Sequence, residues 1–162
     1  MEQAKNAFFW LIGALVIIWS FYMFLGQPAP AKYQAVSKVS LTRPVIKVGE
    51  QSIFIEIADT DEKRSLGLSY RRMLPPGTGM LFIFDTPGIY GFWMRDMKFA
   101  LDIVWIDENW VVVGVARNVP ADSYPQSYVP PSQVKYVLEI NSGEASSLGI
   151  DTGTRLYFDD GK

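Results

Sequence analysis

Hydrophobic and polar residues follow three different patterns along the chain. Residues 7–25 are apolar and carry no charge, and residues 26–41 are rich in small residues and proline without a regular period. Beyond residue 41, apolar and polar side chains often alternate, as at Ile53, Ile55 and Ile57. Alternation of this kind is typical of half-buried strands. The pattern predicts a membrane anchor or uncleaved signal at 1–25, a linker at 26–41 and a soluble β domain at 42–162.

The alternating region predicts short strands at intervals of roughly ten residues, together with two short helices. We expect strands at 44–47, 51–57, 80–84, 90–94, 101–107, 110–116, 136–140 and 155–158. We expect one helix from Asp59, as its N-cap, to Gly67, and another from Asn141 to Gly149. The prolines of residues 117–133 predict a long loop. Many short strands without βαβ alternation favour a mainly β fold, either a β-sandwich or a β-barrel.

The first apolar segment is long enough to cross a membrane. Residues 7–25 form a run of nineteen residues without a charge. As a helix they would cover roughly 28 Å, close to the ~30 Å hydrocarbon core of a bilayer. This length exceeds the usual apolar region of a signal peptide and favours a retained transmembrane helix in the lipid bilayer. Ala29-Pro30-Ala31 resembles a cleavage site, so release after Ala31 is the alternative.

The charges beside this segment give conflicting signals about its orientation. Lys32, Lys38 and Arg43 follow it, whereas only Lys5 precedes it. A count of Lys and Arg alone places the C-terminal side in the cytoplasm. An N-terminal signal-anchor followed by a folded domain more often exports that domain, and the cleavage-like site agrees. We therefore expect an extracytoplasmic domain in the cell envelope.

Composition excludes several kinds of chemistry. The chain has 15 Lys and Arg against 17 Asp and Glu, a net charge of −2, which provides no basic field for nucleic acid. It contains no Cys and no His. Disulfides, a thiol nucleophile, a Ser-His-Asp triad and His- or Cys-based metal sites are therefore excluded. We expect neither a metal nor a cofactor.

Several sequence blocks, in this order, resemble one known family. They are Arg64-Ser65-Leu66-Gly67-Leu68 with Arg71, Gly79-Met80-Leu81-Phe82, Phe92-Trp93-Met94, Leu101-Asp102-Ile103 and Val137-Leu138-Glu139-Ile140-Asn141-Ser142-Gly143. Over about residues 45–158 the chain resembles the domain-of-unknown-function family 192. The resemblance implies a small, mostly β domain of jelly-roll-like sandwich type, often with an N-terminal export signal or anchor. It implies no established activity.

The chain departs from the family pattern at one place. Similar proteins usually have Lys-Asn-Thr after the Phe-Trp-Met block, whereas this chain has Arg95-Asp96-Met97. An amide is replaced by an acid and a hydroxyl by a thioether. If these positions contact a ligand in relatives, its identity could differ here.

Charged residues embedded in apolar segments are the candidates for ligand binding, since a buried charge needs a partner or a purpose. The candidates are Arg64, Arg95, Asp96, Asp102 and Glu139. For Asp102 and Arg64 the alternative to ligand binding is a structural role. Asp102 could be paired with an arginine or with backbone amides. Arg64 could hold its helix against the sheet; in a binding role it would contact a carboxylate or phosphate of the ligand. No catalytic residue is assigned.

Three functions fit these observations. The first, which we favour, is a membrane-tethered module that binds a small molecule, glycan or peptide, with Tyr124, Tyr128 and Tyr136 available for exposed contacts. The second is a hydrolase that uses Asp102 with Glu139, which needs carboxyl groups about 5–5.5 Å or 6.5–9.5 Å apart. The third is a docking domain of a membrane protein complex, marked by an exposed apolar patch.

Overall fold

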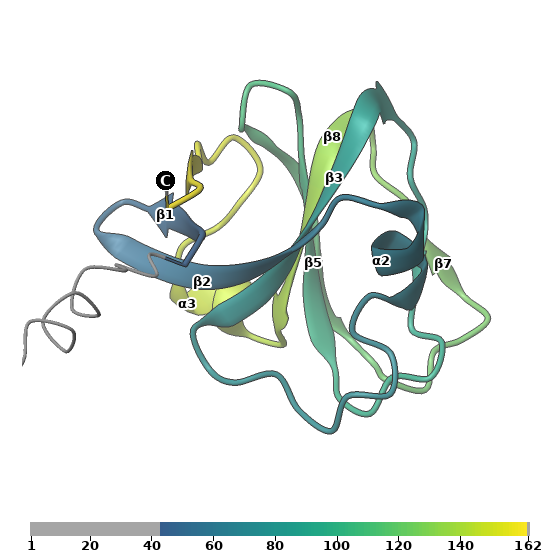
Figure 1. The fold of residues 1–162 in the computed structure, drawn as a ribbon. Helices are drawn as coiled ribbons and strands as arrows, with labels where there is room; N and C mark the ends of the chain where they lie inside the picture. The colour runs from purple at the N-terminus through teal and green to yellow at the C-terminus, as the bar shows by residue number, and fades with distance from the viewer. Residues whose placement is uncertain (1–42, 162) are drawn as a thin grey trace, which may run out of the picture. The chain divides into compact units, whose positions relative to one another are not determined.

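The computed structural model describes residues 43–161 (Figure 1). The predicted anchor at 1–25 and linker at 26–41 lie outside these residues. In the described part of the chain, no helix has the length and apolar character needed to cross a membrane.

The described residues form two sheets and two short helices. The strands are β1 (Val45–Val48), β2 (Gln51–Ala58), β3 (Thr78–Gly88), β4 (Phe92–Trp93), β5 (Leu101–Ile106), β6 (Val112–Val119), β7 (Ser127–Tyr128), β8 (Val134–Asn141) and β9 (Tyr157–Asp159). The helices are α2 (Asp61–Leu66) and α3 (Glu144–Ser147). Seven strands form one sheet in the order β6-β5-β8-β3-β2-β1-β9, and β4 pairs with β7 in a second. Only the β2–β3 pair is parallel, so the large sheet is mixed.

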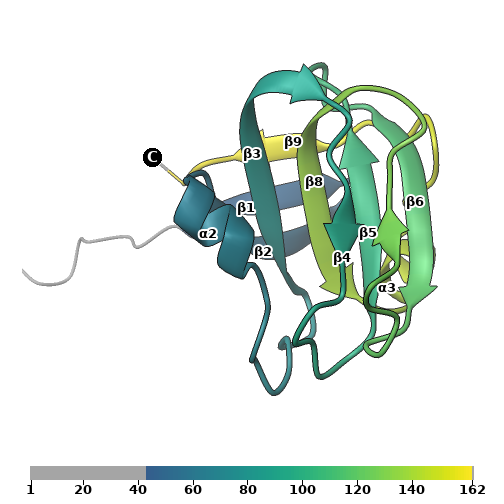
Figure 2. The same ribbon diagram turned by 90° about the vertical axis from the view of Figure 1, so that its right-hand side faces the viewer.

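The expectation of a mainly β fold with two short helices is confirmed, but a closed barrel is wrong. β6 and β9 are the edges of the large sheet and do not pair as strands. In Figure 2, β3, β8, β5 and β6 stand side by side, while β1, β2 and β9 run across them. The two edges meet at a single bridge between Val111 and Arg155. The domain therefore consists of one twisted, mixed seven-stranded sheet and one small two-stranded sheet, and not of two sheets of similar size.

The central strands of the large sheet are covered on both faces. All six residues of β5 are buried. On β8, Leu138 and Ile140 belong to the apolar cluster that includes Ala145 of α3, whereas Val137 belongs to the cluster against which Phe92 of β4 packs. A side chain on either face of these strands therefore lies away from water, and a polar one must find partners inside the protein.

Both helix caps differ from the expected ones. Thr60, rather than Asp59, is the N-cap of α2, because its hydroxyl accepts a hydrogen bond from the Lys63 amide at 3.3 Å. Asp59 instead forms an ion pair with the Lys63 ammonium at 2.7 Å. The helix ends at Gly67, as predicted, with a positive φ of 51°.

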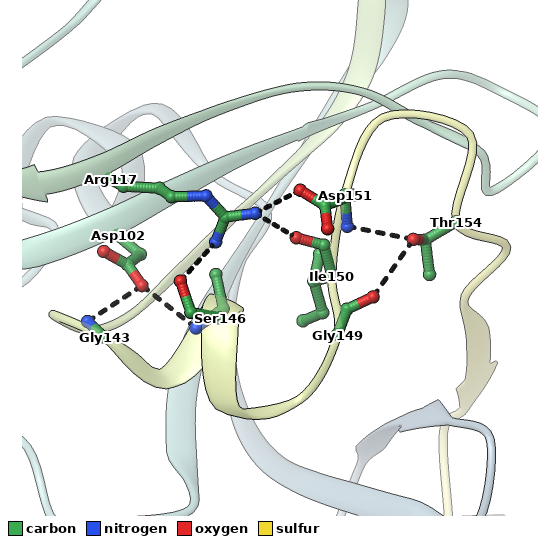
Figure 3. A network of polar contacts seen from close by, with 9 residues as sticks. Asp102, Arg117, Gly143, Ser146, Gly149, Ile150, Asp151 and Thr154 are labelled. Carbon is green, nitrogen blue, oxygen red and sulfur yellow. Dashed lines mark hydrogen bonds and ion pairs between the residues drawn. The ribbon is translucent and has the colours of Figure 1, made fainter.

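The cap of α3 comes from a distant strand. Gly143, rather than Asn141, is its N-cap residue and supplies no side chain. The Asp102 carboxylate of β5 fills this role by accepting hydrogen bonds from the amides of Gly143 at 3.0 Å and Ala145 at 2.9 Å (Figure 3). It also accepts one from the Asn118 amide at 2.8 Å, and it is fully buried. Asp102 thus joins β5, β6 and α3.

Arg117 of β6 holds the other end of α3 in place. Its guanidinium donates to the Ser146 hydroxyl at 3.1 Å and to the Ile150 carbonyl at 2.7 Å (Figure 3). It also pairs with the Asp151 carboxylate. The short helix α3, which could not persist alone, is therefore fixed at both ends by side chains of the sheet.

Replacing Asp102 by alanine should strongly destabilise the domain. The substitution leaves three backbone N–H groups without an acceptor, at about 1–3 kcal/mol for each buried group. We expect Asp102→Ala to lower the free energy of unfolding by at least about 3 kcal/mol, and Asp102→Asn, which keeps one acceptor oxygen, by less. Urea unfolding of the full-length chain in mild detergent, followed by circular dichroism, measures the change. Asp85→Ala removes an exposed carboxyl and serves as the control; equal effects of Asp85→Ala and Asp102→Ala would refute a structural role for Asp102.

Candidate functional site

A pocket of about 370 Å³ opens on the face of the large sheet that α2 covers. Its walls come from α2 and the turn that follows it, from β3, and from the segment that leads into β4. The side chains that define it are Asp61, Arg64, Leu66, Phe82, Phe84, Ile89, Tyr90, Phe92, Trp93, Met97 and Glu139. Its volume lies within the range of small-molecule sites.

Glu139 reaches this pocket because of its register in the sheet. On β8 it lies opposite Met80 of β3 and Ile103 of β5. Successive residues of a strand point to opposite faces, so Glu139 shares a face with Val137 while Leu138 and Ile140 face the other way. An ionisable side chain in the middle of a central strand thus lines the pocket.

The carboxyl of Glu139 is buried without a hydrogen-bond partner among the described residues. Glu139 is 5% exposed, and its side chain forms no hydrogen bond or ion pair with residues 43–161. Burial raises the pKa of Glu139 to about 8, and the attraction of Arg71 only partly offsets this. The Arg71 guanidinium is bound to another acid, Glu56, through two hydrogen bonds of 2.6 and 2.8 Å. Glu139 is therefore largely neutral at pH 7.

Arg64 also lines the pocket, but its hydrogen bonds lie within the domain. Its guanidinium donates to the Ile83 carbonyl and to the Asp61 carboxylate, both at 2.7 Å. It lies 5.4 Å from the centroid of the Phe84 ring, within the range of a cation–π interaction. Arg64 thus holds α2 against β3, which was the structural alternative for this residue.

Paired aromatic rings form much of the wall. The rings of Phe84 and Tyr90 are stacked with centroids 3.6 Å apart, and those of Phe82 and Phe92 meet edge to face at 4.9 Å. The Tyr90 hydroxyl donates to the Thr86 carbonyl at 2.7 Å, which fixes its ring. Interlocked rings of this kind give the pocket a preformed shape.

Gly88 is required for the Phe84–Tyr90 stack. A Cβ atom at position 88 would lie 2.9 Å from the Cζ of Tyr90. Only glycine lets the Tyr90 ring fold back over the end of β3.

Arg95 and Asp96 lie beside the pocket and do not line it. The Asp96 carboxylate accepts a hydrogen bond from the Tyr70 hydroxyl at 2.8 Å, which raises the pKa of Tyr70. The Arg95 carbonyl accepts one from the Ser69 hydroxyl at 3.0 Å. These bonds join the loop after β4 to the turn after α2. Met97, the third residue of the Arg95-Asp96-Met97 segment that differs from the family's Lys-Asn-Thr, does line the pocket.

The sequence candidates therefore do not converge on one cleft. Arg64 and Glu139 line the same pocket, whereas Arg95 is exposed and Asp102 lies on the opposite face of the sheet from Glu139. Asp102 pairs with Ile140 and Glu139 with Ile103 in the β5–β8 register, so the two carboxyls point away from each other. They do not form the facing pair that a carboxylate-dependent hydrolase needs.

Sequence reasoning did not single out Phe82, Phe84 or Tyr90 of the aromatic wall, and it favoured exposed tyrosines elsewhere. Phe84 lies in β3, which continues through the predicted turn at Thr86-Pro87-Gly88, and Tyr90 follows the end of this strand and stacks on Phe84. Tyr136 is stacked on Trp110 at 4.0 Å, and Tyr124 is exposed but outside the pocket. Among residues 43–161, no group of three or more acidic side chains could hold a metal ion.

Comparison with known proteins identifies relatives over nearly all of the described region. The model of the DUF192 family, described as "Uncharacterized ACR", matches residues 44–158. This agrees with the resemblance found in the sequence. No curated protein matches the chain.

Two solved structures are similar. One is a candidate transcription regulator from Sinorhizobium meliloti 1021, with 29% identity and a TM-score of 0.65, covering 72% of this chain and 92% of its own. The other is a protein of unknown function from Novosphingobium aromaticivorans DSM 12444, with 30% identity and a TM-score of 0.65, covering 82% of this chain and 99% of its own. Both share the fold, and neither description states what the pocket binds.

The burial of Glu139 predicts a pH-dependent stability. The pKa is about 8 in the folded state against an ordinary value of 4.5, so between these values the folded chain holds a proton that the unfolded chain has lost. The free energy of unfolding should therefore fall as pH rises through this window, by up to about 1.4 kcal/mol per pH unit. Glu139→Gln should remove this fall, match the wild type near pH 4.5 and exceed it at pH 8.

Urea unfolding of the full-length chain at several pH values measures this effect. Glu108→Gln, which removes an exposed carboxyl in the β5–β6 turn, is the matched control and should keep the wild-type slope. Parallel pH profiles for the wild type and Glu139→Gln would show that Glu139 is ionised in the folded state.

Proposed function

Because the chain belongs to the DUF192 family, whose description names no activity, we propose its function from the pocket itself: the domain binds a small molecule there. The observation that carries the proposal is Glu139, a residue only 5% exposed whose carboxyl has no hydrogen-bond partner in residues 43–161. Burying an unpaired carboxyl lowers stability, so its position at the floor of a preformed pocket favours a role in recognition.

The geometry favours binding over hydrolysis. The second acid of the pocket, Asp61, has a side chain that is 95% exposed and is paired with Arg64. Asp102, the partner expected for a carboxylate pair, points to the other face of the sheet. With no second buried carboxyl facing Glu139, a glycosidase-like mechanism has no support here.

Among the ligands expected from the sequence, the pocket suits a small molecule better than a glycan or an extended peptide. Its walls combine aromatic and aliphatic side chains with polar groups, and its volume of about 370 Å³ would enclose only a compact molecule. Leu66, Ile89 and Trp93 line it and are more than half exposed, which gives its mouth an apolar rim. This rim is the observation that favours docking on a protein as the second candidate function.

Nucleic-acid binding is not part of the proposal. The relative from Sinorhizobium meliloti carries the description of a transcription regulator, but the net charge of −2 gives this chain no basic surface for a phosphate backbone.

Blocking the pocket should abolish small-molecule binding. Ser65 lies on α2, is exposed and lines the pocket, so Ser65→Trp would place an indole across its mouth. Glu62→Trp adds the same side chain to the same helix at an exposed position that does not line the pocket. In a ligand-observed NMR screen of a fragment library, we expect compounds that bind the wild type and Glu62→Trp, with affinity lowered at least tenfold by Ser65→Trp. A screen without any compound sensitive to Ser65→Trp would argue against a binding pocket and leave docking as the better candidate.

We further propose that the chain is tethered to a membrane by residues 7–25, with the β domain outside the cytoplasm. The support is the uncharged run of nineteen residues and its position just ahead of the linker. A tether of this kind would hold the pocket near the bilayer surface.

The tether has a direct test. The full-length chain should stay with the membrane pellet after alkaline carbonate extraction, whereas a chain lacking residues 7–25 should be soluble. Protease added to sealed spheroplasts of an expressing bacterium should digest the β domain if it is extracytoplasmic. A soluble product that begins at Lys32 would instead indicate cleavage after Ala31, and protection from protease would contradict the proposed side.

A further inference from the structure

Only one of the charged groups that line the pocket lacks a partner among the described residues. Arg64 is bound to the Ile83 carbonyl and to Asp61, and this ion pair accounts for both charges. Glu139 has neither a hydrogen bond nor an ion pair within residues 43–161. The one charged group of the pocket that has no partner in this part of the chain is therefore an acid, Glu139.

The surroundings of this acid suit a positive charge on an apolar body. The Phe84 ring already contacts Arg64 and Tyr90. The other lining rings carry π-systems whose faces attract cations, and they are those of Phe82, Tyr90, Phe92 and Trp93. Glu139 itself is buried, and electrostatic attraction is stronger where water is excluded. At the mouth, Leu66 and Ile89 offer apolar surface for the rest of a ligand.

We propose that the pocket binds a small organic cation, an amine carried on an apolar or aromatic body, with the Glu139 carboxylate as its counter-ion. This inference rests on the proposed binding function and specifies its ligand class. On binding, the ammonium group donates hydrogen bonds to the carboxylate, and the body packs between the aromatic wall and the rim.

An anionic ligand is the main alternative, because Arg64 is also in the pocket. Two observations disfavour it. Both terminal nitrogens of the Arg64 guanidinium already donate hydrogen bonds, one of them to the Asp61 carboxylate. An anion bound to Arg64 would also lie beside the Asp61 carboxylate, which already neutralises the guanidinium, and these two like charges would repel.

Affinity for such a cation should rise with pH, because the cation needs the ionised form of Glu139. The groups packed around this carboxyl are Met80 of β3 and Ile103 of β5, which are apolar, and Arg71, which favours ionisation but is neutralised by Glu56. The remaining titratable groups of the pocket are Asp61, Arg64 and Tyr90. Since the free pocket holds its proton up to a pKa of about 8, binding below that pH releases one proton. Affinity should then rise about tenfold per pH unit between roughly pH 5 and 7.

Three probes of one shape and different charge test the inference. They are 2-phenylethylamine, which is a cation below pH 9, the neutral 2-phenylethanol and the anionic phenylacetate. Titration calorimetry with the full-length chain in nonionic detergent at pH 7.5 should show the amine binding at least tenfold more tightly than the alcohol, and phenylacetate binding least. The affinity of the amine should increase between pH 5.5 and 7.5, while that of the alcohol should stay constant.

Two variants isolate the role of the acid. Glu139→Gln keeps the shape and the hydrogen-bonding capacity of the side chain but removes its charge, so it should lower affinity for the amine to that for the alcohol. Glu108→Gln makes the same change at an exposed turn and should behave as the wild type. Thermal unfolding confirms that each variant is folded before titration.

The possible outcomes separate this inference from the proposed function. Preference for phenylacetate or for the alcohol, or amine binding that Glu139→Gln leaves unchanged, would overturn the cation inference while leaving a binding pocket in place. A failure to bind any of the three probes, with other fragments still lost in Ser65→Trp, would also overturn only the inference. If neither the probes nor the fragments depend on the pocket, the proposed function fails with it.

Discussion

Burial of the central strands on both faces is the constraint on which the rest of this domain depends. β5 and β8 lie between two apolar clusters, so neither strand has a face in water. Two carboxyls lie on these neighbouring strands and point to opposite faces. Asp102 receives three backbone hydrogen bonds and thereby fixes α3, whereas Glu139 receives none in the described chain and opens into the pocket. Asp102, whose carboxylate is hydrogen-bonded, stabilises the fold, whereas Glu139, whose carboxyl has no such partner, lines the candidate site.

The sequence predicted the strands of the sheet better than it predicted the partners of its polar residues. Alternation located β1 and β2, and short apolar runs located β5 and β8, in each case to within two residues at each end. The edges were less well predicted: β6 begins at Val112 and continues into the expected loop. Its start follows Trp110, whose positive φ of 63° no propensity would indicate.

The sequence indicated which charged residues are unusual, but it did not indicate which of them lie together in the pocket. Asp102 and Glu139 were singled out for the same reason, burial in apolar strands, and only the pairing register separates their roles. Asp102 needed the distant amides of α3, a long-range pairing that local patterns do not encode. The Phe84–Tyr90 stack is local in the sequence, but it depends on how the chain folds back after the end of β3. Of the candidates, Arg64 and Glu139 line one pocket, whereas Arg95, Asp96 and Asp102 do not.

The partners of the arginines near the pocket explain why Glu139 has no ion-pair partner in the described chain. Arg64 is paired with Asp61, and Arg71 with Glu56, so each guanidinium close to the site has a carboxylate of its own. The carboxylates of both pairs are exposed, where hydration makes an ion pair easy to form, whereas pairing Glu139 would require the desolvation of a whole guanidinium. A small ammonium ligand can pair with Glu139 without taking an arginine away from Asp61 or Glu56, and it can keep its apolar body against the rim. The same arrangement that leaves Glu139 unpaired in the protein thus leaves room for a partner supplied from outside.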